Sequence, residues 1–162
     1  MAVFTVIDHT EVGAAGVASW EVTGISASYD HLYIVASARH NQAGYLDSML
    51  FQLNSDSGTD YSQTRLGTNG STFSNRSATQ ITAELPADSV TANTFGTFSA
   101  WIPNYANTSH FKPVLIQGAV EGATTALNTF QVYVVAGLYS STAAVSAVKL
   151  VGQGSDVFVQ YS

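Results

Sequence analysis

Cysteine is absent, so neither a cysteine nucleophile nor a thiolate metal site is available, whereas acids, histidines and hydroxyls are plentiful enough to consider for catalysis. Asp47, Asp56, Asp60 and Glu84 supply the residue types of a glycosidase pair, which needs two carboxyl groups about 5 to 9 Å apart. Any acidic domain carries such groups on its surface, so solvated carboxylates are the simpler interpretation. Serines are abundant, yet no Gly-x-Ser-x-Gly nucleophile elbow occurs. We therefore expect no catalytic residue and no enzyme activity.

The sequence predicts no metal and no cofactor site. Residues 54–60 (NSDSGTD) alternate oxygen-bearing side chains as a calcium loop does, but glycine stands fifth and Arg65 twelfth. An EF-hand loop requires glycine in the sixth place and a bidentate acid in the twelfth. Asx turns explain the same residues. Residues 13–16 (GAAG) precede a strand pattern, whereas a phosphate cradle precedes a helix. No His-x-x-x-His spacing occurs among the four histidines, which are His9, His31, His40 and His110.

The charge of the chain narrows the range of expected partners. The chain of 162 residues carries eleven acidic and five scattered basic side chains, with a net charge of -6. Phosphate neutralisation needs clustered Lys and Arg, so we expect neither nucleic acid nor an anionic membrane as a partner. The first residues show no basic region followed by an apolar one, which predicts synthesis in the cytoplasm without a secretory signal.

Apolar and polar residues alternate in segment after segment, which is typical of half-buried strands. In 31–39, for example, Leu32, Ile34, Ala36 and Ala38 share one face. No segment repeats apolar residues at helical spacing over several turns, so we expect minimal helix. The predicted strands are residues 3–10, 18–22, 31–39, 47–54, 80–85, 98–102, 114–120, 130–138, 145–151 and 157–161.

The longest apolar stripe belongs to the strand predicted at 130–138. It consists of Phe130, Val132, Val134, Ala136 and Leu138. The opposite face of this strand also carries Tyr133 and Val135, so we expect the strand to be central in its sheet.

About ten short strands, each with one face to bury, predict two stacked antiparallel sheets. The expected fold is therefore all-β, a jelly-roll-like β-sandwich forming one domain over residues 1–162, with a closed barrel as the alternative. Residues 55–78 show no clear strand pattern and are rich in Gly, Asn and Asp. We predict a long loop there, and loops of this length in compact domains are usually functional or disordered.

Three blocks of sequence carry a family resemblance. They are residues 54–66 (NSDSGTDYSQTRL), 102–108 (IPNYANT, with Lys112 and Leu115 following) and 137–150 (GLYSSTAAVSAVKL). In these blocks the chain resembles the small β-sandwich virion proteins of tailed bacteriophages, which include capsid decoration (cement) proteins and modules of tail fibres. The ending, VQYS, departs from the Leu-Tyr-Gly-Ile ending common in that family. Because the blocks are strands and turns, the resemblance bears on architecture more than on the bound surface.

The resemblance implies a structural protein without catalytic residues. The leading expectation is a decoration protein on the capsid surface of the virion, which forms a homotrimer and bridges subunits of the major capsid protein. The alternative is a tail-fibre or receptor-binding module that recognises a host glycan, and a third class is a glycan hydrolase using Asp56 or Asp60. The residues that we predict at subunit contacts are Phe73, Asn75, Arg76, Tyr105 and Asn107. The alternative for Tyr105 and Phe73 is that they plug the ends of the sandwich, which is the commoner fate of aromatic residues.

Overall fold

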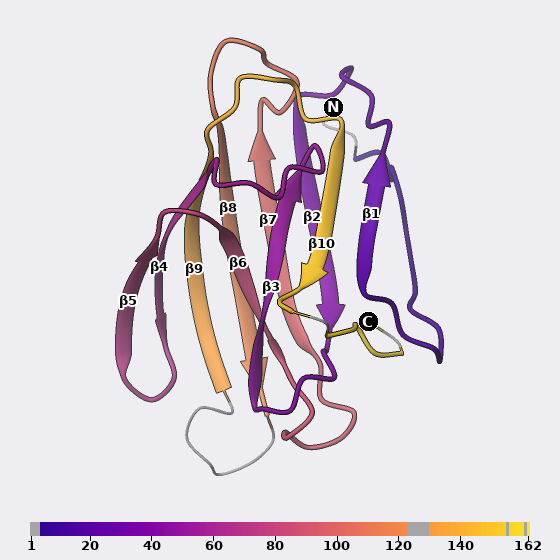
Figure 1. The fold of residues 1–162 in the computed structure, drawn as a ribbon, viewed down its shortest axis with the longest axis vertical. Coiled ribbons are helices and arrows are strands. Elements are labelled where there is room, and N and C mark those ends of the chain that lie inside the picture. The colour runs from indigo at the N-terminus through magenta and orange to yellow at the C-terminus, as the bar shows by residue number, and fades with distance from the viewer. Residues whose placement is uncertain (1–3, 123–129, 155, 161) are drawn as a thin grey trace.

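The chain folds into ten β-strands without a helix in the part that the structure, a computed structural model, describes: residues 4–122, 130–154, 156–160 and 162 (Figure 1). No helix of that part is long and apolar enough to cross a membrane. The strands are β1 (Ser19–Thr23), β2 (His31–Ala38), β3 (Leu46–Leu53), β4 (Tyr61–Thr68), β5 (Thr72–Ser77), β6 (Ile81–Pro86), β7 (Gly96–Pro103), β8 (Lys112–Glu121), β9 (Phe130–Tyr139) and β10 (Ala147–Gly152).

The strands form two antiparallel sheets that stack as a β-sandwich. One sheet has four strands in the order β1-β10-β3-β6, and the other has six in the order β2-β7-β8-β9-β4-β5. Every pair of neighbouring strands in these sheets is antiparallel. The all-β sandwich that alternation predicted is confirmed.

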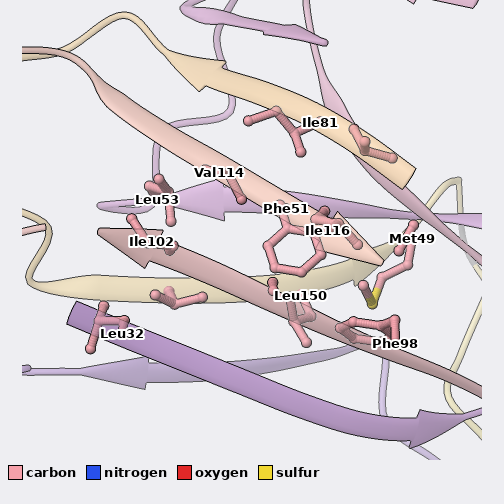
Figure 2. Packing of buried hydrophobic residues seen from close by; sticks show 14 of the residues in the cluster. Leu32, Met49, Phe51, Leu53, Ile81, Phe98, Ile102, Val114, Ile116 and Leu150 are labelled. Atoms are coloured by element: carbon pink, nitrogen blue, oxygen red, sulfur yellow. The ribbon is translucent and has the colours of Figure 1, made fainter. Parts of the chain in front are cut away.

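One hydrophobic core fills the space between the sheets (Figure 2). Phe51 of the four-stranded sheet meets Phe98 of the six-stranded sheet edge to face, with ring centroids 5.8 Å apart, a favourable aromatic geometry. The alternation of β2 is confirmed, since Leu32 and Ala38 are buried while Tyr33 is exposed. The inward residues of β3, β6 and β7 are also those that alternation predicted.

Strand β9 is central, as predicted, but its longest apolar stripe faces outward. Val132 and Val134 are 60% and 43% exposed, while the alternate residues Tyr133 and Val135 are buried. Two glycines make room for this arrangement: a Cβ at Gly118 would lie 2.2 Å from the Tyr133 hydroxyl oxygen. A Cβ at Gly137 would lie 2.8 Å from Ile81, closer than real Cβ atoms come to their neighbours.

Residues 55–78 are not a long loop, which corrects the sequence prediction. They hold the antiparallel hairpin of β4 and β5, with Gln63 opposite Ser77 and Arg65 opposite Asn75. The pattern was hidden because the inward residues of β4 include polar Gln63 and Arg65, while Leu66 points outward. Six strands are about 10 Å wider than four, so the hairpin overhangs the smaller sheet (Figure 1).

Two predicted strands at the ends of the chain are not strands in the described residues. Residues 4–10 pair with no strand, and their backbone makes no hydrogen bond among the described residues. Residues 157–160 make only isolated bridges, in which Phe158 pairs with Val17 and His40. The remaining residues of these predictions, Val3 and Tyr161, lie outside the described part.

Candidate functional site

The outer side of the six-stranded sheet presents an apolar surface, here called the outer face. Strand register places Tyr33 beside Trp101 and Trp101 beside Leu115. On neighbouring strands, Leu66 pairs with Val134. The outer face consists of the exposed apolar side chains Tyr33, Val35, Leu66, Trp101, Leu115, Val132 and Val134.

The interior of the outer face carries no formal charge, although the chain has sixteen acidic and basic residues (five plus eleven). The other side chains on the same side of these strands are those of Thr64, Thr68, Thr97, Ser99, Gln117, Ala119 and Ala136. Charged residues of these strands, apart from inward-facing ones, stand at the margin: Glu121 ends β8, and Arg76 lies on the edge strand β5. A partner that covers this face would therefore not pay the free-energy cost of dehydrating an ionised group at its centre.

A polar groove, here called the Arg65 groove, lies where the β4–β5 hairpin overhangs β6. The groove has a volume of about 310 Å³ and is lined by Ser48, Gln63, Arg65, Asn75, Arg76, Ser77, Gln80, Thr82 and Glu84. A separate hollow of about 360 Å³ lies toward the tip of the hairpin and shares Arg65 and Asn75 with the groove.

Arg65 is held in place by a buried polar network. Its Nη1 lies 2.5 Å from Glu84 Oε1, and its Nη2 donates to Gln131 Oε1. The guanidinium sits between two aromatic rings, 5.2 Å from the Phe73 centroid and 5.1 Å from that of Tyr133, in cation–π geometry. Glu84 thus neutralises the buried charge of Arg65, and the network holds the Arg65 side chain in one position at the bottom of the groove.

The open edge of β6 is closed by side chains of the larger sheet. The Thr82 N–H donates to Gln63 Oε1 over 2.8 Å. The Tyr133 hydroxyl accepts from the Glu84 N–H and donates to the Glu84 carbonyl, each over 3.0 Å. Burial raises the pKa of the Tyr133 phenol well above its ordinary value. These bonds satisfy backbone groups that an edge strand otherwise offers to another chain.

The structure brings three of the five predicted contact residues together. Phe73, Asn75 and Arg76 lie on β5, where Asn75 and Arg76 are exposed and Phe73 is half-buried under Arg65. Asn107 is exposed in the turn after β7, and its Oδ1 accepts the Ser109 N–H over 2.6 Å.

The structure supports the alternative for Tyr105, because its side chain is fully buried. Its hydroxyl donates to the Ser26 carbonyl, and its ring belongs to the core cluster. The phenol plugs one end of the sandwich, which is the usual fate of an aromatic residue next to a core. This turn is separated from β5 by β8, β9 and β4, so the five residues form no common surface.

A buried His–Asp pair escaped the sequence prediction. His40 Nδ1 lies 2.5 Å from Asp47 Oδ2, and the histidine ring packs edge to face on Phe158 at 4.5 Å. His40 is fully buried, so a substrate has no access to it. Only the proximity of the two residues in sequence, seven apart across the turn into β3, hints at the pair. We interpret it as a structural bond.

The calcium-like segment 54–60 forms local turns, as predicted. Asp56 Oδ1 accepts the Gly58 N–H over 2.7 Å, which is an Asx turn. Asn54 Oδ1 accepts the Ser146 N–H over 2.8 Å and so ties the turn to the start of β10. Among the described residues, no three His, Asp or Glu side chains gather in a way that could hold a metal ion.

Comparison with known proteins gives no relative: no family model, no curated protein and no solved structure matches this chain.

Proposed function

We propose that this chain is a structural protein that decorates the outside of a phage capsid and bridges neighbouring subunits of the major capsid protein. The observation that carries the proposal is the outer face. Six strands of about eight residues cover roughly 650 Å² in projection. A standard protein–protein interface buries about 800 Å² on each partner, so this one face is nearly large enough. Its chemistry, with aromatic and β-branched side chains and no central charge, is that of an interface core.

The strand pairing supports the jelly-roll part of the expectation. β1 pairs with β10, β2 with β7, β3 with β6 and β4 with β5. If β8 and β9 are set aside, these pairs are nested around the β4–β5 hairpin, as the eight strands of a jelly roll are. The resemblance to virion proteins points the same way, and we infer a place on the virion surface after synthesis in the host cytoplasm, as a homotrimer.

The outer face gives a direct test of the proposal. Trp101→Ser combined with Val134→Ser is expected to weaken binding to purified phage heads by at least 30-fold, since a central aromatic contact typically contributes 2 kcal/mol or more. Co-sedimentation of the variant with heads measures the loss. Tyr45→Ser is the matched control, because Tyr45 is 45% exposed but lies outside the outer face, while Trp101 is 41% exposed. Unchanged binding of a folded double variant would refute the proposal.

The alternative function, recognition of a host glycan at a tail fibre, is favoured by the Arg65 groove. Hydroxyl, amide and guanidinium groups line it and offer the hydrogen bonds that sugar hydroxyls need. Under this alternative, Asn75→Ala with Gln80→Ala is expected to abolish binding to host polysaccharide in calorimetry, while Tyr45→Ser leaves binding intact. If the wild-type chain shows no heat of binding with host-surface polysaccharide, the alternative fails. Counting copies per virion separates the functions further, since decoration requires hundreds of copies and a fibre tip a handful.

A further inference from the structure

Residues 4–11 (FTVIDHTE), here called the arm, have the sequence of a strand but pair with no strand of the described residues. β-branched residues and an alternating pattern favour extended structure. Every residue of the arm is exposed, and Phe4 and Val6 are 88% and 80% exposed. Large apolar side chains that are this exposed and close together are usually covered by a binding partner.

The arm is positioned rather than loosely attached. At its base, Val12 is buried and its N–H donates to the Ser162 carbonyl over 3.2 Å. Trp20 Nε1 of β1 donates to Asp8 Oδ2 over 3.0 Å and lies 3.1 Å from Thr10 Oγ1. The Phe4 ring lies 6.4 Å from that of Tyr33 on β2. These side-chain contacts hold the arm beside β1 and β2 (Figure 1), while its backbone makes no hydrogen bond within the part of the chain that the structure describes.

Strand β5 offers the complementary edge. It is the last strand of the six-stranded sheet, and among the described residues it pairs only with β4 and has no strand at its other edge. Unlike the edge of β6, this edge is capped by no side chain of the described part. β5 also carries Arg76, which is exposed and makes no ion pair in the described part of the chain. The arm carries Asp8 and Glu11, so the charges of the arm and of β5 are opposite.

We propose that the arm of one copy adds as a strand to the free edge of β5 in a second copy of this chain. Strand addition would pair the free backbone groups of both segments and cover Phe4 and Val6. A copy cannot satisfy its own β5 in this way, because β2 and β5 are at opposite ends of the sheet, about 24 Å apart. Because the contact joins two different surfaces, copies that repeat it form a closed ring when the rotation between neighbouring copies is a whole fraction of a turn. This inference does not depend on the proposed capsid role.

Engineered disulfides test the contact, because the chain contains no cysteine of its own. Val6→Cys protein mixed with Ser74→Cys protein is expected to give at least tenfold more mixed disulfide, after mild oxidation, than Val6→Cys mixed with Ser37→Cys. Ser37 is the matched control, since it is exposed on β2, the other edge strand of the same sheet. Equal yields from the two mixtures would overturn the proposal.

Hydrogen exchange and sedimentation of the unmodified chain provide a second readout. In the self-associated form, the amides of residues 4–11 are expected to exchange at least tenfold more slowly than in a dilute monomer. Arg76→Glu, which places a third acid opposite Asp8 and Glu11, is expected to weaken self-association and to remove this protection. A wild-type chain that stays monomeric at high concentration, or an arm that gains no protection, would contradict the proposal. Capsid binding is measured separately, so its failure would leave this result intact.

Discussion

Replacing Glu84 by alanine is expected to lower the free energy of unfolding by about 3 to 5 kcal/mol. Glu84 and Arg65 form an ion pair at 2.5 Å, with side chains 11% and 8% exposed. Removal of the carboxylate leaves the guanidinium charge buried without its counterion, and Ser48 Oγ loses its acceptor. Urea denaturation of the variant and the wild type measures the difference.

Two further variants distinguish the effect of a buried, unpaired charge from the effect of simply losing an ion pair. Glu21→Ala removes the partner of Lys149 from a pair at 3.9 Å whose side chains are about 30% exposed, so the expected loss is below about 1 kcal/mol. The double variant Arg65→Leu/Glu84→Leu is expected to be more stable than Glu84→Ala, because it leaves no uncompensated charge in the network. A double variant that is less stable than Glu84→Ala would show that the pair does not act in this way.

A steep loss of stability above about pH 10 is the second large effect that the structure predicts. Burial raises the pKa of four tyrosines, Tyr61, Tyr105, Tyr133 and Tyr139. Below about pH 10 these phenols are neutral in both the folded and the unfolded chain, so they add no pH dependence. Above it the unfolded chain releases protons that the folded chain retains. Each phenol then lowers the free energy of unfolding by up to about 1.4 kcal/mol per pH unit, and four by up to about 5.

Lys112 opposes this trend over a limited range. Burial lowers the pKa of its ammonium group, so the unfolded chain holds more protons than the folded one between the lowered pKa and the ordinary value of about 10.5. The free energy of unfolding therefore rises with pH in that interval. The rise per pH unit is no larger than the fall that one buried tyrosine causes, and it ends above about pH 10.5.

Denaturation series at several alkaline pH values measure the slope. Tyr139→Phe is expected to reduce the slope by up to about a quarter, since it removes one of the four contributions. Tyr33→Phe is the matched control, because it removes the hydroxyl of a residue that is 54% exposed. Stability that stays constant through this range would contradict the role of the buried phenols.

Alternation predicted most of the fold because most strands have one apolar and one polar face. Strands β2, β3 and β7 follow this rule closely, and their positions and inward residues agree with the prediction. The rule failed for β4, since Gln63 and Arg65 turn inward to meet β6 and Leu66 turns outward. Residues 4–10 failed for a different reason: they have the pattern of a strand, yet in the described part of the chain their backbone makes no hydrogen bond to β1 or β2, the edge strands beside them.

The candidate site was harder to predict than the fold. Strand β9 has apolar residues on both faces, so the sequence cannot say which face is buried. Only the space at Gly118 and Gly137, which lets Tyr133 and Ile81 fit inside, decides the orientation, and that space depends on a neighbouring strand and the opposite sheet. The outer face therefore emerges from tertiary packing. Tyr105 shows the same limit, since the sequence leaves open whether its ring makes a subunit contact or plugs the sandwich.

The environment of Lys112 determines where amine chemistry can reach the folded chain. Its Nζ donates to the carbonyls of His110, Thr142 and Ser141, over 2.8, 3.2 and 3.4 Å, and the residue is fully buried. The only other lysine is Lys149, at the β1–β10 side of the smaller sheet. Aldehyde fixatives and succinimidyl dyes will therefore find a single side-chain amine on the native molecule. Labels attached in this way leave the larger sheet unmodified.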